Sequence, residues 1–125
     1  MTLSVHVFRV EDDGEMTLLD TPSAGSELAG FESFRTSVWG CEGVRDLGAR
    51  FFPVLASGDL VVAPADVLEF LAECALLRSH LGAIAPATDS GHSHEWYVEV
   101  ISHRLSNIEQ ASHRALETSC GVMIW

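Results

Sequence analysis

Lysine is absent from this sequence, and its seven basic residues are all arginines scattered along the chain. This absence excludes Schiff-base chemistry and the lysine of phosphate-binding P-loops. Seven basic residues against eighteen carboxylates give a formal net charge of −11 and form no basic face. Because nucleic acids and anionic membranes are held mainly through basic side chains, we expect neither as a partner.

Cysteine is also scarce: Cys41, Cys74 and Cys120 are widely spaced and odd in number. This pattern matches neither a disulfide framework nor a zinc site, and it is typical of buried thiols in a reducing cytoplasm. No apolar run reaches the roughly 20 residues of a membrane span. Residues 1–4 carry no basic side chain and Arg9 interrupts the apolar stretch, so we expect a cytoplasmic protein without a signal peptide.

Sequence motifs of catalysis are missing as well. There is no Gly-x-Ser-x-Gly nucleophile elbow and no glycine-rich phosphate loop. The stretch His92-Ser93-His94-Glu95 is closest to a metal-binding pattern, but it lacks a third ligand at helical spacing. The alternative is a polar loop in which Ser93 caps a helix. We therefore expect no metal, no cofactor and no catalytic residue.

The beginning of the chain predicts a β-hairpin. Residues 3–10 are rich in β-branched side chains, and the turn over residues 11–14 ends in Asp-Gly. Residues 15–19 return as a second strand with Met16 and Leu18 on one face.

Two short helices are expected next. Ser26 is a suitable N-cap, and apolar residues follow it at near-helical spacing. These residues are Leu28, Phe31, Phe34 and Val38. Residues 44–52 predict the second short helix, which Pro53 should end or kink.

The second half of the chain predicts a short strand over Asp59–Ala63, centred on Leu60–Val62, and a helix that starts after Pro64. The apolar stripe of this helix is Val67, Phe70, Leu71, Cys74, Leu77 and Leu81. Its polar face carries Asp66, Glu69 and Glu73.

A long amphipathic helix is expected from about His94 to Thr118, although residues 96–101 would also suit a strand. Gly121 is the expected helix cap, and Val122–Trp125 reads as a final strand paired inside the sheet. Residues 1–125 thus predict a single α+β domain, with a sheet of about four strands and helices packed on one face.

Acidic residues are concentrated in two places. The chain up to Glu32 holds seven acids and one base, including the run Glu11-Asp12-Asp13, and the helix with Asp66, Glu69 and Glu73 forms a second group. A solvated surface explains both groups, and so does electrostatic complementarity to a basic protein partner.

Trp39 is a candidate interface anchor. It stands beside Gly40 at an expected helix break, where a side chain can be half-exposed. The alternative is a tryptophan packed over the sheet edge.

The chain resembles small bacterial immunity proteins, the cytoplasmic antidotes to polymorphic toxins. The resemblance rests on size, acidity, the all-arginine basic set and three stretches: Phe34-Arg35-Thr36-Ser37-Val38-Trp39, Arg104-Leu105-Ser106-Asn107-Ile108 and the Gly121–Trp125 ending. It implies a non-enzymatic protein that binds and blocks a toxin, often a basic nuclease.

Three hypotheses follow from the sequence. In the first, the acidic surface, with Glu11, Asp12, Asp13, Asp66, Glu69, Glu73 and Trp39, binds a basic protein such as a toxin. In the second, the chain is a small enzyme or a ligand- or metal-binding domain. Its pocket would lie between sheet and helices and use His6, His92, His94 or Glu95. In the third, the long helix supports a homodimer or a larger assembly.

Overall fold

Antiparallel pairing around one strand organises the sheet. The computed structural model describes residues 2–125, and β1 (Thr2–Val10) lies in the middle of five strands. β5 (Gly121–Ile124) pairs along one edge of β1, and β4 (Leu60–Val62) pairs with β5. The other edge of β1 is shared by β2 (Met16–Leu18) and β3 (Leu28–Phe31). The expected C-terminal strand inside the sheet is therefore confirmed.

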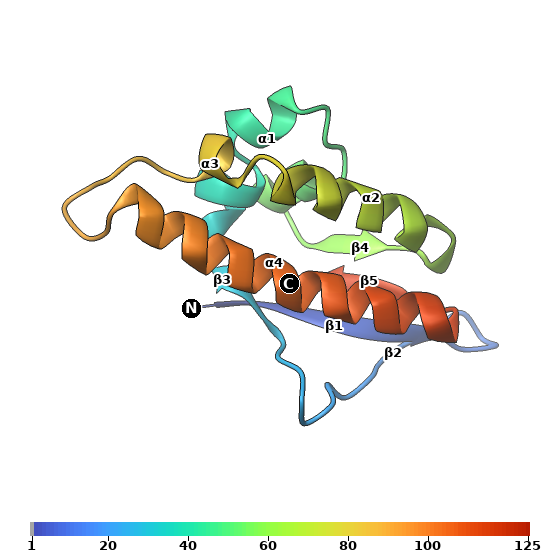
Figure 1. Ribbon diagram of the computed structural model, residues 1–125. Helices are drawn as coiled ribbons and strands as arrows, with labels where there is room; N and C mark the ends of the chain where they lie inside the picture. Colours follow the sequence, from blue (N-terminus) through green and yellow to red (C-terminus); the bar gives the residue numbers. More distant parts are fainter. Residues whose placement is uncertain (1) are drawn as a thin grey trace.

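Helices cover one face of this sheet (Figure 1). The longer ones are α2 (Val67–Arg78) and α4 (His94–Thr118), which pack against each other over the strands. The shorter ones are α1 (Glu42–Asp46), α3 (Leu81–Ile84), a π-helical turn η1 (Arg35–Trp39), and two 3₁₀ turns, η2 (Phe52–Ala56) and η3 (Pro64–Asp66). The expected α+β class, with helices on one side, is confirmed.

The helix α4 has the predicted boundaries. Ser93 is its N-cap, and the Ser93 hydroxyl accepts a hydrogen bond from the Trp96 N–H at 3.1 Å. Residues 96–101 are helical, so their alternative assignment as a strand is wrong. The apolar stripe faces the core, where Ile101, Leu105, Ile108, Ala111, Ser112 and Ala115 are buried.

The end of α4 differs from the prediction. Ser119, not Gly121, closes the helix in the left-handed conformation, with φ 56°. Gly121 lies in β5 opposite Phe8, and a Cβ built on it would lie 2.2 Å from the Phe8 ring. A glycine is therefore required there because an aromatic ring lies across the strand.

The short helix predicted after Ser26 is wrong in its first part. Leu28–Phe31 forms β3 instead, because pairing with the free edge of β1 satisfies the backbone. Gly30 permits this path with φ +123°, and the Phe34 ring packs directly over it. Pro53 does not end a helix but stands in the first turn of η2.

Candidate functional site

Within residues 2–125, no layer covers the face of the sheet opposite the helices (Figure 1). Alternate residues of β1, β4 and β5 point into the core, where Val5, Val7, Leu60, Val62, Val122 and Ile124 are buried. Their neighbours point the other way and include many apolar side chains. We call the residues Val10, Met16, Leu18, Val61, Met123 and Trp125 the outer sheet face.

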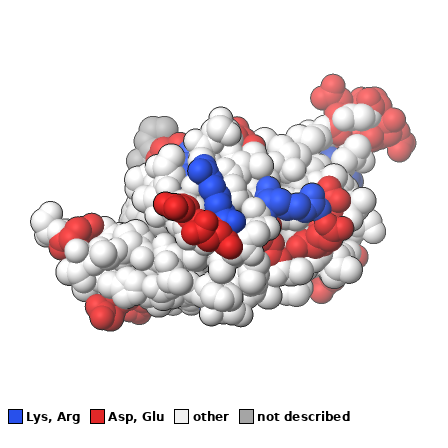
Figure 2. All heavy atoms as spheres, turned by 90° about the horizontal axis from the view of Figure 1, so that it is seen from above, with Lys and Arg blue, Asp and Glu red and all other residues white. Residues whose placement is uncertain are grey.

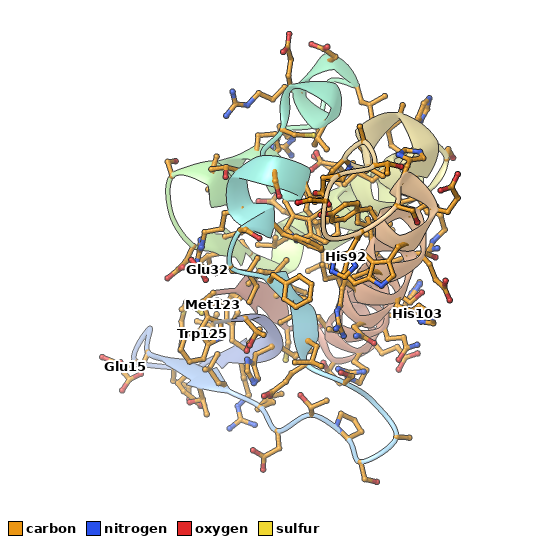
Figure 3. The ribbon with its side chains drawn as sticks, turned by 90° about the vertical axis from the view of Figure 1, so that its left-hand side faces the viewer. Glu15, Glu32, His92, His103, Met123 and Trp125 are labelled. Carbon is orange, nitrogen blue, oxygen red and sulfur yellow. The ribbon has the colours of Figure 1, made fainter. Side chains whose placement is uncertain are left out.

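The outer sheet face is exposed over several strands. Val10, Met16, Leu18, Val61 and Trp125 have 41–49% of their surface exposed. Register places these residues in cross-strand rows, with Val10 opposite Met16 and Val61 opposite Met123. Figure 3 shows Met123 and Trp125 on the side of the sheet away from α4. Such a row of apolar side chains is typical of a face that contacts another molecule.

A hydrogen-bond chain fixes Trp125 at one end of this face. The Trp125 indole N–H donates to His6 Nδ1 at 3.0 Å, and His6 Nε2 lies 2.8 Å from Glu27 Oε2. The side chain is thus held in place although 46% of its surface is exposed. A pre-positioned tryptophan loses little rotamer freedom on binding, which favours an interface role.

Acidic residues border the opposite end of the sheet. Glu11, Asp12, Asp13 and Glu15 surround the β1–β2 turn, and only Arg9, paired with Glu11 at 3.0 Å, offsets them. Figure 2 shows an acidic cluster at the end of the molecule where this turn lies in Figure 1. The predicted acidic surface therefore exists at Glu11, Asp12 and Asp13, of which the two aspartates are exposed.

The acidic residues of α2 do not form one binding surface. Figure 1 places the start of α2 at the same end of the molecule as the β1–β2 turn, but in the helical layer. Asp66 is half-buried, and the exposed Glu69 pairs with Arg50. Glu73 is only 8% exposed, and its carboxylate accepts hydrogen bonds from the N–H groups of Arg50, Phe51 and Phe52. Its assignment to a solvated polar face was wrong.

Trp39 is not an interface anchor. Its side chain has no exposed surface, and its indole N–H donates to the Ala29 carbonyl at 3.0 Å. It packs between Phe34 and Phe52 in the core. The alternative was a tryptophan packed over the sheet edge, and the structure buries Trp39 completely beside the edge strand β3. Trp125, in contrast, has 46% of its surface exposed, although its sequence position predicted only the end of a strand.

The histidine-rich stretch serves the start of α4. His94 Nδ1 lies 2.9 Å from the Pro86 carbonyl, and His92 stacks on Trp96. His6 lies on the sheet, and Glu95 is exposed on the helix, so these residues do not converge. Among residues 2–125, no three histidine, cysteine or carboxylate side chains are placed to hold a metal ion.

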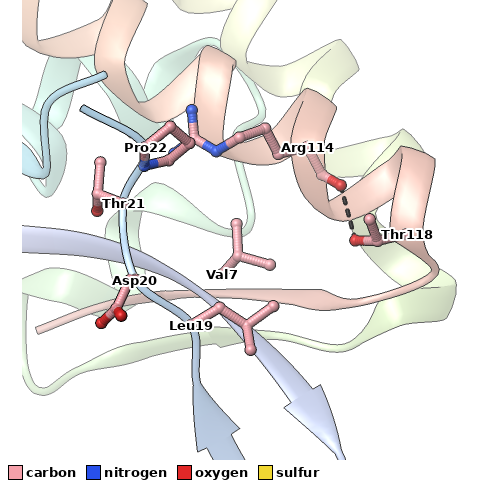
Figure 4. A pocket seen from close by; sticks show the side chains of 7 residues that line it. All are labelled: Val7, Leu19, Asp20, Thr21, Pro22, Arg114 and Thr118. Carbon is pink, nitrogen blue, oxygen red and sulfur yellow. Dashed lines mark hydrogen bonds between the residues drawn. The ribbon is translucent and has the colours of Figure 1, made fainter. Parts of the chain in front are cut away.

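Several hollows lie beside α4. One, of about 250 Å³, is lined by Val100, His103, Arg104 and Asn107 of the helix alone. Two others also involve other parts of the chain. The first, of about 130 Å³, has an apolar floor of Val7, Leu19 and Pro22, with Arg114 and Asp20 at its rim (Figure 4). The second, of about 380 Å³, lies between the β3–η1 segment and the start of α4. Aromatic side chains dominate the second, which is the more distinctive of the two.

Within the described chain, residues 2–125, no helix has the length and apolar character needed to cross a membrane. Comparison with protein-family models, with curated proteins and with solved structures finds no match to the chain. Its function is therefore inferred from its own geometry.

Proposed function

We propose that this chain is a non-enzymatic protein-binding protein that covers and blocks a basic partner. The observation that carries the proposal is the outer sheet face, an apolar surface left uncovered by a two-layer fold. It adjoins an acidic turn with four carboxylates and one arginine. The partner surface that fits it is an apolar patch bordered by basic side chains.

The two parts of this surface have different roles. Apolar side chains at the centre of an interface supply most of the affinity, and single anchors such as tryptophan contribute about 2 kcal/mol or more. Exposed charges at the rim mainly speed association and select the partner. Trp125 and Leu18 are accordingly the expected affinity residues, and Asp12 and Asp13 are the expected steering residues.

A second copy of the chain is a less suitable occupant of the outer sheet face. Each copy carries a net charge of −11 and brings its own acidic turn, so self-association adds like-charge repulsion. A basic protein gains attraction instead. The resemblance to immunity proteins supports a toxin as this partner. The unpaired Cys41, Cys74 and Cys120 support a reducing compartment such as the cytoplasm.

The test is affinity capture from the native host with matched variants of the chain. Wild type, Leu18→Ser/Trp125→Ser and a control, Leu68→Ser, are used as bait at low and high salt. Leu68 is 66% exposed but lies on α2, in the helical layer. We expect a basic protein to be retained near one-to-one by wild type and control, released by salt, and lost from the double variant.

Either of two results would contradict the proposal. One is that no protein is retained by wild type at any salt concentration. The other is that the outer-face variant retains the same partner as well as wild type does. For a partner that is retained, Asp12→Lys/Asp13→Lys should slow association and weaken its dependence on ionic strength. Unchanged association rates would remove the steering role of the turn.

A further inference from the structure

A hollow lined by aromatic side chains lies between the segment from Phe31 to Ser37 and the start of α4. Phe31 of β3 and Phe34, which directly precedes η1, form one wall, and α4 supplies Trp96 and Tyr97 to the other. Phe31 is 39% exposed, and Trp96 and Tyr97 are half-buried, so their rings are accessible from the hollow. The volume of about 380 Å³ accommodates the end of a side chain or a small molecule.

The hollow already holds one flat, nitrogen-containing ring. The His92 imidazole stacks on the Trp96 indole with 3.4 Å between ring centroids and 8° between the planes. This arrangement shows that the face of Trp96 now covered by His92 accepts a planar group in parallel contact. His92 stands on an exposed loop, so a ligand can replace its ring without rearranging the core.

A carboxylate is fixed at the rim of the same hollow. Asp89 accepts hydrogen bonds from the Tyr97 hydroxyl at 2.6 Å and from the Gly91 and His92 N–H groups, both at 2.8 Å. These bonds, that from Tyr97 first, hold the pKa of Asp89 below its usual range, so the group is ionised at neutral pH. Three bonds leave lone-pair capacity on the two oxygens for a further donor.

The remaining polar groups of the hollow can accept hydrogen bonds from a ligand. Ser33 and Ser37 contribute hydroxyl groups, and no arginine or lysine belongs to the lining. A planar cation suits this set because it stacks on aromatic faces, pairs with carboxylates and carries several N–H donors. The chain's overall charge of −11 adds attraction for cations.

We propose that the hollow between β3–η1 and the start of α4 binds a guanidinium group, which stacks on Trp96 in place of His92 and pairs with Asp89. This site does not depend on the outer sheet face. The guanidinium belongs either to a small free compound or to an arginine side chain within a peptide, and the two sources share the same contacts.

The test follows the indole N–H signal of Trp96 by NMR during titration with arginine amide. The signal is identified by its loss in Trp96→Phe. The matched ligands are citrulline amide, whose side chain is uncharged but nearly isosteric with that of arginine, and lysine amide, whose side-chain cation is not planar. A Gly-Gly-Arg-Gly-Gly peptide amide distinguishes the two sources of the group. The protein variants are Asp89→Asn, His92→Ala and the control Asp20→Asn, which removes one charge outside the hollow.

We expect saturable binding of arginine amide, with at least fivefold weaker binding of citrulline amide and lysine amide. Asp89→Asn should weaken binding at least fivefold, and Asp20→Asn should change it less than twofold. His92→Ala should strengthen binding, because the ligand no longer displaces a ring from Trp96. If the peptide binds more tightly than arginine amide, the natural ligand is an arginine side chain within a peptide. If both bind equally, the natural ligand is a small free compound.

Other outcomes overturn the proposal. One is that arginine amide and citrulline amide bind equally well, and another is that Asp89→Asn leaves the affinity unchanged. Either result would show that the hollow does not select a charged ligand. The absence of any shift at the Trp96 signal would show no site at all. A thermal melt of each variant confirms that it is folded. Protein capture through the outer sheet face is a separate readout, so failure of one proposal leaves the other to its own test.

Discussion

The buried carboxylate of Glu73 should be a main contributor to the stability of this protein. Its two oxygens accept hydrogen bonds from three consecutive backbone N–H groups, those of Arg50, Phe51 and Phe52, at 2.6–3.1 Å. These three N–H groups lie where the chain enters η2, and no backbone carbonyl within residues 2–125 accepts a hydrogen bond from them. One side chain from α2 therefore fixes the path of a distant loop against the core.

The expected effect of Glu73→Gln follows from these contacts. Glutamine keeps the shape but offers one acceptor oxygen, and its NH₂ group faces backbone N–H donors. Loss of charge-assisted hydrogen bonds to buried donors costs about 1.5–3 kcal/mol each, so we expect a loss of about 3 kcal/mol in the free energy of unfolding. With an unfolding entropy of about 2.1 cal/mol/K per residue, this lowers Tm by about 11 °C.

Urea denaturation and thermal melts at pH 7 measure this loss. Glu69→Gln is the matched control, since Glu69 stands one turn earlier on the same helix and forms an exposed pair with Arg50. Exposed pairs contribute at most about 1 kcal/mol, and we expect less than 0.5 kcal/mol for this one. The reasoning is refuted if Glu73→Gln costs less than about 1 kcal/mol, or no more than Glu69→Gln.

Three further predictions concern thiol reactivity, acid stability and the last strand. Burial raises the pKa of the Cys74 thiol far above its ordinary value. A thiol reagent at pH 8 should therefore label the half-buried Cys41 in the native protein, and Cys74 only on unfolding. Fast labelling that persists in Cys41→Ser contradicts this. The lowered pKa of Asp89 means that its ionised form stabilises the fold. Its contribution to the free energy of unfolding is present above the unfolded pKa of about 3.9, and it is lost as the pH falls through the folded pKa. Urea titrations should therefore show the stability difference between wild type and Asp89→Asn constant from pH 7 to about pH 5 and smaller below about pH 4; a difference that does not change with pH argues against it. Deletion of Val122–Trp125 removes the strand between β1 and β4 and should abolish soluble folding, which a sharp melting transition in the truncated chain would disprove.

Local sequence signals were sufficient where one element is determined by its own pattern. α4 is such a case, because its apolar stripe and the Ser93 cap both mark the same start. The segment with Leu28 and Phe31 is the opposite case. Its apolar spacing suits a helix, yet it forms a strand because the free edge of β1 lies beside it, a fact that no local pattern contains. The prediction that Gly121 caps α4 was wrong for the same reason, because the Phe8 ring that excludes a side chain at Gly121 is 113 residues away in the sequence.

The candidate surfaces were predictable only in part. The acidic turn follows directly from consecutive carboxylates, whereas the burial of Glu73 depends on a loop that approaches α2 from elsewhere in the chain. A signal for the outer sheet face was present in β5, which is apolar at every position, as expected of a strand whose two faces both contact apolar groups. The aromatic hollow needed the structure, because Phe31 and Trp96 are 65 residues apart.

The pairing of β1 with β5 also governs when this protein can fold. Val5 is opposite Ile124 and Phe8 is opposite Gly121, so the central contact of the sheet joins segments more than 100 residues apart. During synthesis, β1 leaves the ribosome long before its partner exists, and its apolar residues remain without their sheet neighbour until then. Folding therefore has to wait for nearly all of the described chain and to close a very long loop, which slows it. During that interval the edge of β1 that pairs with β5 remains open to pairing with other strands.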